Sequence, residues 1–272
     1  MSSLTTISLD KLARLIGTPK CPALIDVRTD DDFAADPRLI PGSVRHAHTD
    51  VTAWAGRFQG RSAIVICQKG QKLSHGVAAW LRHEGVPSDV LECGFQAWAR
   101  AELPAVPTAR MPNRDPQGRT VWVTRGRPKI DRIACPWLIR RFVDPAAVFL
   151  FVTPSEVQAV GERFNAAPFD IEDVFWSHRD GLCTFDIMVE EFGLRTEALL
   201  RLGTIVRGAD TANLALAPES AGLLAASLGL SRMYTDDLAQ LEAGLTLYDA
   251  FYRWCRDATD ETHNWPSRKP GA

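Results

Sequence analysis

The sequence contains no long apolar run. Its 272 residues are 46% hydrophobic, but no stretch reaches the roughly 18–20 consecutive apolar residues that a helix needs to cross a bilayer. The first six residues, MSSLTT, also lack the basic patch and apolar segment of a secretory signal. These absences argue against a membrane-spanning protein and predict a cytoplasmic one.

An excess of charge of one sign is also lacking. The chain has 31 Lys and Arg residues against 33 Asp and Glu residues, which gives a formal net charge of −2. Proteins that bind nucleic acid or anionic membranes through electrostatic attraction present an excess of basic residues. The near balance of charges therefore predicts neither nucleic acid nor membrane as a partner.

Closely spaced cysteine pairs are absent as well. The six cysteines, at positions 21, 67, 93, 135, 183 and 255, include no C-x-x-C pair, which excludes a zinc ribbon and a thioredoxin-like redox motif. In a reducing compartment, scattered cysteines are more often buried small hydrophobic residues than disulfide partners. The question becomes which of them is placed for reactivity.

The chain divides at a segment rich in proline and charged residues. Residues 107–119 (PTARMPNRDPQGR) show no apolar periodicity and are typical of a linker, which predicts one domain at 1–106 and a second at 120–272. In the first, short apolar runs at 23–28 and 63–67 alternate with helical segments. This alternation predicts an α/β domain with a mainly parallel sheet flanked by helices.

The second part has a different pattern. After one expected strand at 119–124, it is rich in Ala, Leu and Glu, with apolar residues three and four apart. Such spacing is typical of amphipathic helices. The sequence therefore predicts a mainly α-helical second domain.

Cys67 lies where a strand gives way to a helix. It ends the apolar run at 63–67, and the residues that follow before the expected helix are Gln68, Lys69, Gly70, Gln71, Lys72 and Leu73. A loop that leads into a helix N-terminus directs several backbone N–H groups to one point and adds the positive end of the helix dipole. With Lys69 and Lys72 nearby, this environment favours the thiolate, which is the nucleophilic form of cysteine. The structural alternative is that Cys67 is simply the buried last residue of a strand.

Five segments around this turn resemble the motifs of the rhodanese family, in the family's order. They are residues 24–28 (LIDVR), 40–44 (IPGSV), 64–70 (IVICQKG), 78–85 (AAWLRHEG) and 91–98 (LECGFQAW). The resemblance implies a sulfurtransferase that needs no cofactor. Cys67 would take a sulfane sulfur from a small-molecule donor as a persulfide and pass it to a thiol acceptor. The resemblance also implies that Asp26 and Arg28 are buried and support the active-site side of the sheet.

Departures from the family pattern leave two other functions open. Lys72 and Leu73 stand where the family usually has Arg and Ser, and the helix motif lies one residue farther from Cys67 than usual. This spacing predicts a seven-residue loop at 67–73, and longer loops in this superfamily resemble those of cell-cycle phosphatases and arsenate reductases. The second hypothesis is therefore a thiol-based oxyanion reductase or phosphatase, although Leu73 cannot donate two hydrogen bonds to an oxyanion as Arg does. The third is a non-catalytic anion-sensing module.

The second part resembles the C-terminal domain of chromate-resistance proteins of the ChrB type. The matching segments are residues 121–142, 169–170, 178–186, 205–211 and 247–254. The resemblance implies a link to resistance against chromate or related oxyanions. Regulators of that family carry a DNA-binding part where this chain resembles a rhodanese, which argues against a repressor.

A group of potential metal ligands follows in the same part of the chain. It consists of His178, Cys183, Asp186 and Glu190, with Asp210 on another expected helix. Imidazole, thiolate and carboxylate groups suit zinc or iron, and Asp186 and Glu190 lie one helical turn apart. The alternative is structural, with Thr184 as a helix cap and acidic residues that complement the helix dipole. The sequence does not specify an oligomeric state.

Overall fold

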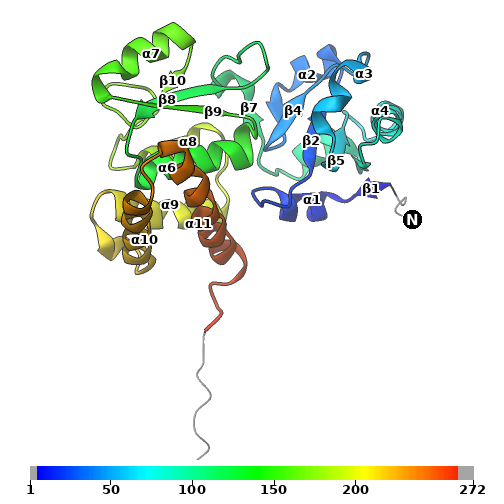
Figure 1. Cartoon of the computed structure of the whole chain (residues 1–272). Helices are drawn as coiled ribbons and strands as arrows, with labels where there is room; N and C mark the ends of the chain where they lie inside the picture. Colours follow the sequence, from blue (N-terminus) through cyan, green and yellow to red (C-terminus); the bar gives the residue numbers. More distant parts are fainter. Residues whose placement is uncertain (1–4, 263–272) are drawn as a thin grey trace, which may run out of the picture.

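The chain folds into two domains (Figure 1), and the computed structural model describes residues 5–262. Residues 1–4 and 263–272, which belong to the two ranges expected from the sequence, lie outside the described residues. No helix within residues 5–262 is long and apolar enough to cross a membrane.

The N-terminal domain is built on a parallel sheet of five strands in the order β1-β6-β5-β2-β4. The strands are β1 (Thr6–Ile7), β2 (Ala23–Asp26), β4 (Ser43–Arg45), β5 (Ala63–Ile66) and β6 (Ser88–Leu91). The central strands β2 and β5 are buried along their whole length, which is why they are continuous apolar runs in the sequence. The expected α/β fold with a parallel sheet is confirmed.

Successive residues of β5 face opposite layers of helices. Ile64 and Ile66 belong to the core that includes side chains of α1 (Leu9–Leu15) and α5 (Gly94–Arg100). Val65 and Cys67 belong to the core with α3 (Val51–Trp54) and α4 (Lys72–His83). Because side chains alternate along a strand, Cys67 points to the α4 side of the sheet. The domain also contains α2 (Asp30–Ala35) and a 3-10 helix (Ala55–Phe58).

The C-terminal domain combines helices with a second parallel sheet, of order β10-β8-β9. The sequence predicts only β8 (Val121–Arg125); β9 (Val148–Val152) and β10 (Ala167–Pro168) flank it. The helices are α6 (Ile130–Leu138), continued by a π turn (Ile139–Val143), α7 (Val157–Phe164), α8 (Thr184–Glu191), α9 (Glu197–Asp210), α10 (Glu219–Met233) and α11 (Asp237–Asp257). The domain is mainly helical, as expected.

The segment expected as a linker, residues 107–119, is held against the folded domains. Its start forms β7 (Val106–Pro107), which pairs antiparallel with β3 (Arg38–Leu39). The Thr108 N–H donates to the Pro37 carbonyl at 3.1 Å, and the backbones of Arg114 and Thr120 form an isolated antiparallel β-bridge. These backbone contacts satisfy polar groups that an extended linker would leave to water.

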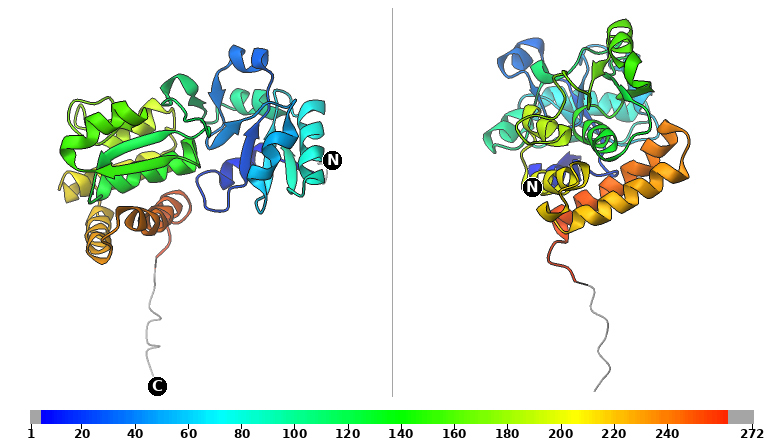
Figure 2. Two further views of the ribbon diagram at one scale, coloured as in Figure 1. Left: turned by 45° about the horizontal axis from the view of Figure 1, so that its top comes forward. Right: turned by 90° about the vertical axis from the view of Figure 1, so that its left-hand side faces the viewer.

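The two domains lie side by side (Figure 2). They share a continuous apolar core, which contains Leu12 of the first domain together with Phe142 and Tyr252 of the second. Gly17 lies at this contact with φ +77°, and a Cβ there would sit 2.3 Å from Phe142 Cζ. The Gly42 N–H also donates to the Phe142 carbonyl at 2.6 Å. The domains therefore pack as one body.

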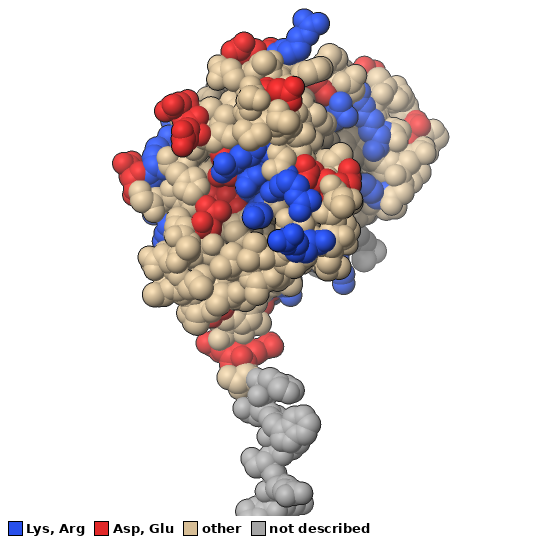
Figure 3. All heavy atoms as spheres, turned by 60° about the vertical axis from the view of Figure 1, so that its left-hand side comes forward, with Lys and Arg blue, Asp and Glu red and all other residues tan. Residues whose placement is uncertain are grey.

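Charged side chains are mixed on the face drawn in Figure 3, where Lys and Arg lie beside Asp and Glu. Several form ion pairs within the C-terminal domain, such as Arg179 with Glu191 and Arg140 with Glu242. Exposed pairs of this kind each stabilise a fold by about 0–1 kcal/mol. Their contribution to the stability of the fold is therefore small.

Candidate functional site

Cys67 lies directly after β5 at the carboxyl edge of the parallel sheet, and only 4% of it is exposed. The next helix, α4, begins at Lys72. The loop between them therefore comprises residues 68–71, and Lys72 and Leu73 belong to the first turn of the helix. The expected seven-residue loop at 67–73 is wrong, because the helix takes up the extra length. The argument from loop length for a phosphatase or oxyanion reductase falls with it.

Ser74 contacts the Cys67 sulfur from the first turn of α4. The thiol of Cys67 donates to Ser74 Oγ at 3.1 Å, and the Ser74 hydroxyl donates in turn to the Gln71 carbonyl at 2.9 Å. Ser74 is completely buried. It was missing from the expected site residues, although side chains in a first helical turn point back toward the N-terminus and so toward the loop.

The loop carries hydrogen-bond donors with no partner. Within residues 5–262, the backbone N–H groups of Gln68, Lys69, Gly70 and Gln71 donate no hydrogen bond. The side chains of Lys69 and Lys72 are exposed beside them. Free N–H groups at the positive end of a helix can stabilise a thiolate, a persulfide or a bound oxyanion.

Two glycines let this loop approach the turn before α5. Gly70 and Gly94 have φ values of +61° and +63°. A Cβ on Gly70 would lie 2.5 Å from the Leu91 carbonyl oxygen, and one on Gly94 would lie 2.3 Å from that of Cys67. The Phe95 N–H donates to the Cys67 carbonyl at 2.9 Å and so fixes the position of the cysteine backbone.

Asp26 and Arg28 form a buried pair beside this loop. Arg28 Nε donates to Asp26 Oδ2 at 2.8 Å, and the two residues are 1% and 0% exposed. The guanidinium also donates to the carbonyls of Asp36 and Arg38, at 3.0 and 2.6 Å. It lies 3.7 Å from the ring centroid of Phe95, whose N–H holds the Cys67 carbonyl. The pair thus supports the loop through Phe95.

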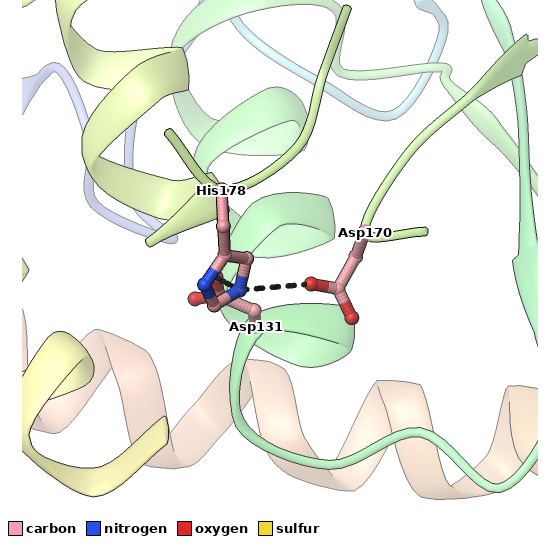
Figure 4. A group of neighbouring side chains, drawn as sticks. All are labelled: Asp131, Asp170 and His178. Atoms are coloured by element: carbon pink, nitrogen blue, oxygen red, sulfur yellow. Dashed lines mark ion pairs between the residues drawn. The ribbon is translucent and has the colours of Figure 1, made fainter. Parts of the chain in front are cut away.

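A second cluster of polar side chains lies in the C-terminal domain (Figure 4). His178 Nε2 is 3.5 Å from Asp131 Oδ2, 3.4 Å from Asp170 Oδ1 and 3.3 Å from Asp210 Oδ2. Asp131 is in α6, Asp170 follows β10, and Asp210 ends α9. One donor atom from each of Asp131, Asp170 and His178 lies within 4.8 Å of the others. A single metal ion can bridge atoms at that spacing.

Burial and crowding set the charges in this cluster. Burial raises the pKa of Asp131 to about 7, and the neighbouring carboxylates of Asp210 and Asp170 add to the effect. The carboxylates, Asp131 foremost, raise the pKa of His178 to about 12. At neutral pH, without another cation, His178 is therefore an imidazolium among three acidic groups.

Only His178 and Asp210 of the five expected ligands meet in this cluster. Cys183 is buried as the N-cap residue of α8, the place that the structural alternative gives to Thr184, and its N–H donates to Asp186 Oδ2 at 3.2 Å. Asp186 also pairs with Arg207 at 2.8 Å.

Glu190, the fifth expected ligand, is exposed and pairs with Arg195. It follows Asp186 by one turn of α8, and both carboxylates have arginine partners instead of His178. Asp131 and Asp170, which were not among the ligands expected from the sequence, are the residues that join His178 in the cluster. Their sequence signal was an acidic residue next to apolar ones, Ile130 and Phe169 respectively.

Comparison with known protein families accounts for both domains. The family "Rhodanese-like domain" matches residues 8–101, and "ChrB, C-terminal domain" matches residues 122–255. The chain joins a rhodanese-like domain to a ChrB C-terminal domain. Both resemblances found in the sequence are confirmed.

Among curated proteins, the chain is similar to Protein ChrB of Cupriavidus metallidurans. The two are 35% identical over 147 residues, which cover 52% of this chain and 43% of that protein. The chain thus matches less than half the length of this relative.

Among solved structures, the rhodanese-like domain is similar to a rhodanese-like domain protein from Staphylococcus aureus. The identity is 24%, the match covers 35% of this chain and 91% of that chain, and the TM-score is 0.32. A thiosulfate sulfurtransferase from Pseudomonas aeruginosa is 24% identical over 37% of this chain and 19% of its own, with a TM-score of 0.33.

A cavity of about 850 Å³ lies between the rhodanese-like domain and the ChrB C-terminal domain. Its walls are mainly apolar, and its charged lining residues are Arg45, Arg57, Arg61, Arg114, Arg119 and Asp144. Three of the arginines pair with acidic side chains. Arg57 and Arg61 form no ion pair within residues 5–262, so the cavity carries uncompensated positive charge.

His46 lines the wall of this cavity, and its surroundings lower the pKa of its imidazole. Its ring stacks on Trp54 with 4.8 Å between centroids. Burial, followed by the charges of Arg57 and Arg114, lowers the pKa of His46 to about 4. His46 is therefore neutral at neutral pH, and the arginines supply the positive charge of the cavity.

Proposed function

We propose that the rhodanese-like domain is a sulfurtransferase whose reacting atom is Cys67 Sγ. In the first step the thiolate attacks the outer sulfur of thiosulfate. The new sulfur–sulfur bond forms on Cys67, the old one in the donor breaks, and sulfite leaves with its electron pair. In the second step cyanide or a thiolate attacks the outer sulfur of the persulfide, and the Cys67 thiolate is restored. The two steps balance without an outside oxidant or cofactor.

The observation that carries this proposal is the setting of the Cys67 sulfur. It lies between the end of β5 and the N-terminus of α4, 3.1 Å from Ser74 Oγ, beside a loop whose N–H groups donate no hydrogen bond to any described residue. Thiolate and persulfide are both anions, so the same donors and the same helix dipole favour each of them. The exposed Lys69 and Lys72 would attract an anionic sulfur donor.

Thiocyanate formation from thiosulfate and cyanide tests the proposal. Wild-type protein should produce thiocyanate, and Cys67→Ser should abolish the activity. Cys93→Ser is the matched control, because Cys93 is an exposed thiol at the turn before α5. A wild-type protein that stays silent with thiosulfate, a thiosulfonate and polysulfide would overturn the proposal.

We further propose that this activity acts in the cytoplasm during exposure to chromate or related oxyanions. The ChrB C-terminal domain and the 35% identity to Protein ChrB support this setting. Cells that produce the wild-type chain should grow better on chromate than cells that produce Cys67→Ser. Equal growth of both strains would show that resistance does not depend on sulfur transfer at Cys67.

Anion sensing without turnover is the second candidate, and the arginine-lined cavity favours it. Arg57 and Arg61 have no acidic partner within residues 5–262, so an anion in the cavity would meet two free guanidinium groups. Titration with sulfate by calorimetry distinguishes the candidates. Loss of binding in the double variant Arg57→Ala/Arg61→Ala, with binding retained in Cys67→Ser, would support sensing in the cavity. The reverse pattern would place the anion at the Cys67 loop.

A further inference from the structure

The arrangement around His178 Nε2 is not explained by hydrogen bonding. N–H···O hydrogen bonds between heavy atoms span about 2.7–3.2 Å, whereas the three carboxylate oxygens lie 3.3–3.5 Å away. One N–H also cannot point at three acceptors. The ring nitrogen instead faces three oxygen atoms at nearly equal distances, and these come from α6, from the segment after β10 and from the end of α9.

These distances fit ligands around a shared metal ion. Two donor atoms bound tetrahedrally at about 2.0–2.1 Å from a zinc ion lie about 3.3–3.4 Å apart. The separations of 3.5, 3.4 and 3.3 Å from His178 Nε2 bracket this value. Asp131, Asp170 and His178 also meet the mutual 4.8 Å spacing, with Asp210 adjacent to the histidine.

A buried oxygen without a partner marks the same place. The Asp131 side chain is fully buried, and its Oδ1 atom accepts no hydrogen bond within residues 5–262. An unpaired buried carboxylate oxygen is costly unless a cation or donor satisfies it. Oδ2 of the same residue, the atom 3.5 Å from His178 Nε2, accepts from the Phe185 N–H at 3.3 Å and keeps a second lone pair for a metal ion.

The carboxylates are oriented by further contacts, as metal ligands usually are. The Thr184 hydroxyl donates to Asp170 Oδ1 at 3.0 Å, and Arg132 Nε lies 3.2 Å from Asp170 Oδ2. Arg132 and, at 3.9 Å, Arg125 both pair with Asp170, whereas Asp131 and Asp210 have no arginine partner within residues 5–262. The His178 side chain is 43% exposed, so an ion can reach the site from solvent.

We propose that Asp131, Asp170 and His178, with Asp210 beside them, bind one divalent transition-metal ion. Carboxylates suit manganese, and imidazole suits zinc and iron. The site is in the ChrB C-terminal domain, and its occupancy does not depend on sulfur transfer at Cys67.

Manganese binding to the full chain tests this site with little interference from the six cysteines, since thiolates favour softer metals. Protein stripped with a chelator is titrated with Mn²⁺, and the free ion is followed by its electron paramagnetic resonance signal; Zn²⁺ is titrated separately by calorimetry. We expect one Mn²⁺ per chain. Asp131→Asn and His178→Gln should each weaken binding more than about a hundredfold, beyond the loss that replacing an outer contact causes.

Glu190→Gln is the matched control, because this exposed carboxylate belongs to the same domain and pairs with Arg195 instead. It should bind Mn²⁺ as the wild type does. Circular dichroism checks the fold, and the partly exposed His178 supplies the decisive variant if Asp131→Asn does not fold. Binding of Zn²⁺ alone that His178→Gln abolishes would also support the site. Absence of stoichiometric binding of either ion, or wild-type affinity in His178→Gln, would overturn it.

Discussion

The sulfur of Cys67 and the hydroxyl oxygen of Ser74 lie 3.1 Å apart, between the end of β5 and the first turn of α4. The Ser74 hydroxyl in turn donates to the Gln71 carbonyl at the end of the loop. This chain of contacts couples the position of the proposed nucleophile to the helix that follows it.

Replacement of Ser74 by alanine should slow sulfur transfer. Loss of one hydrogen bond, with a net value of about 0.5–1.5 kcal/mol, should lower the rate of thiocyanate formation by about two- to tenfold. Ser231→Ala, at another buried serine but in α10, should leave the rate unchanged. If Ser74→Ala matched the wild type, the contact would be structural only.

Gly70 and Gly85 provide a pair of substitutions that separates backbone strain from steric overlap. Both have positive φ, so alanine at either costs about 1–2 kcal/mol in the left-handed region. A Cβ on Gly70 would also lie 2.5 Å from the Leu91 carbonyl oxygen, whereas one on Gly85 meets nothing within 4 Å. Gly70→Ala should therefore lower the free energy of unfolding, measured in urea, more than Gly85→Ala does. It should also lower the rate of sulfur transfer. Equal losses in the two variants would contradict the close approach.

The buried pair of Asp26 and Arg28 should be far more sensitive than an exposed one. Arg28→Met leaves the Asp26 carboxylate buried without its partner, which should cost about 3–5 kcal/mol of stability. Arg38→Met breaks the exposed pair with Asp36 and should cost no more than about 1 kcal/mol. Chemical denaturation of both variants checks the difference, and similar small losses would show that Arg28 does not support the fold.

His46 should make stability depend on pH below neutrality. Burial, Arg57 and Arg114 lower its pKa to about 4 in the folded chain, while an unfolded histidine has a pKa of about 6.5. Between these values the unfolded state binds the extra proton, so this contribution is present above about pH 6.5 and is lost as the pH falls toward 4. His46→Phe keeps a ring against Trp54, and its unfolding free energy should decline less over this window. Parallel curves for the two proteins would contradict the assignment.

Thr184 should tune the proposed metal site through Asp170. Its hydroxyl donates to Asp170 Oδ1 at 3.0 Å, and loss of such outer contacts lowers metal affinity by about 10–100-fold. Thr184→Val should weaken Mn²⁺ binding to that extent. Thr204→Val removes a hydroxyl that donates to the Leu200 carbonyl, away from the cluster, and should have no effect. Equal affinities in the two variants would argue against Asp170 as a ligand.

Local patterns in the sequence were sufficient to predict the core of the rhodanese-like domain. The runs that became β2 and β5 are buried on both faces, and so their composition alone indicates strands. The strand β9 was missed because its residues are only half buried and its pairing with β8 is a tertiary contact. The loop length was mispredicted because the boundary at Lys72 depends on how α4 packs.

The C-terminal cluster shows why ligand sets are harder to predict than strands. His178 and Asp210 were expected, but Asp131 and Asp170 are separated from His178 by chain segments whose folding no spacing rule describes. Helical periodicity correctly placed Asp186 and Glu190 one turn apart in α8, yet both pair with arginines. Spacing within one helix shows which residues are neighbours, and it does not show which side chains from other elements they meet.

Mass spectrometry of the wild-type chain after incubation with thiosulfate tests the central proposal most directly. We expect the peptide that contains Cys67 to gain the mass of one sulfur atom, to lose it on addition of cyanide, and to stay unmodified in Cys67→Ser. An unmodified Cys67 peptide under conditions that modify the exposed Cys93 would contradict persulfide chemistry at Cys67.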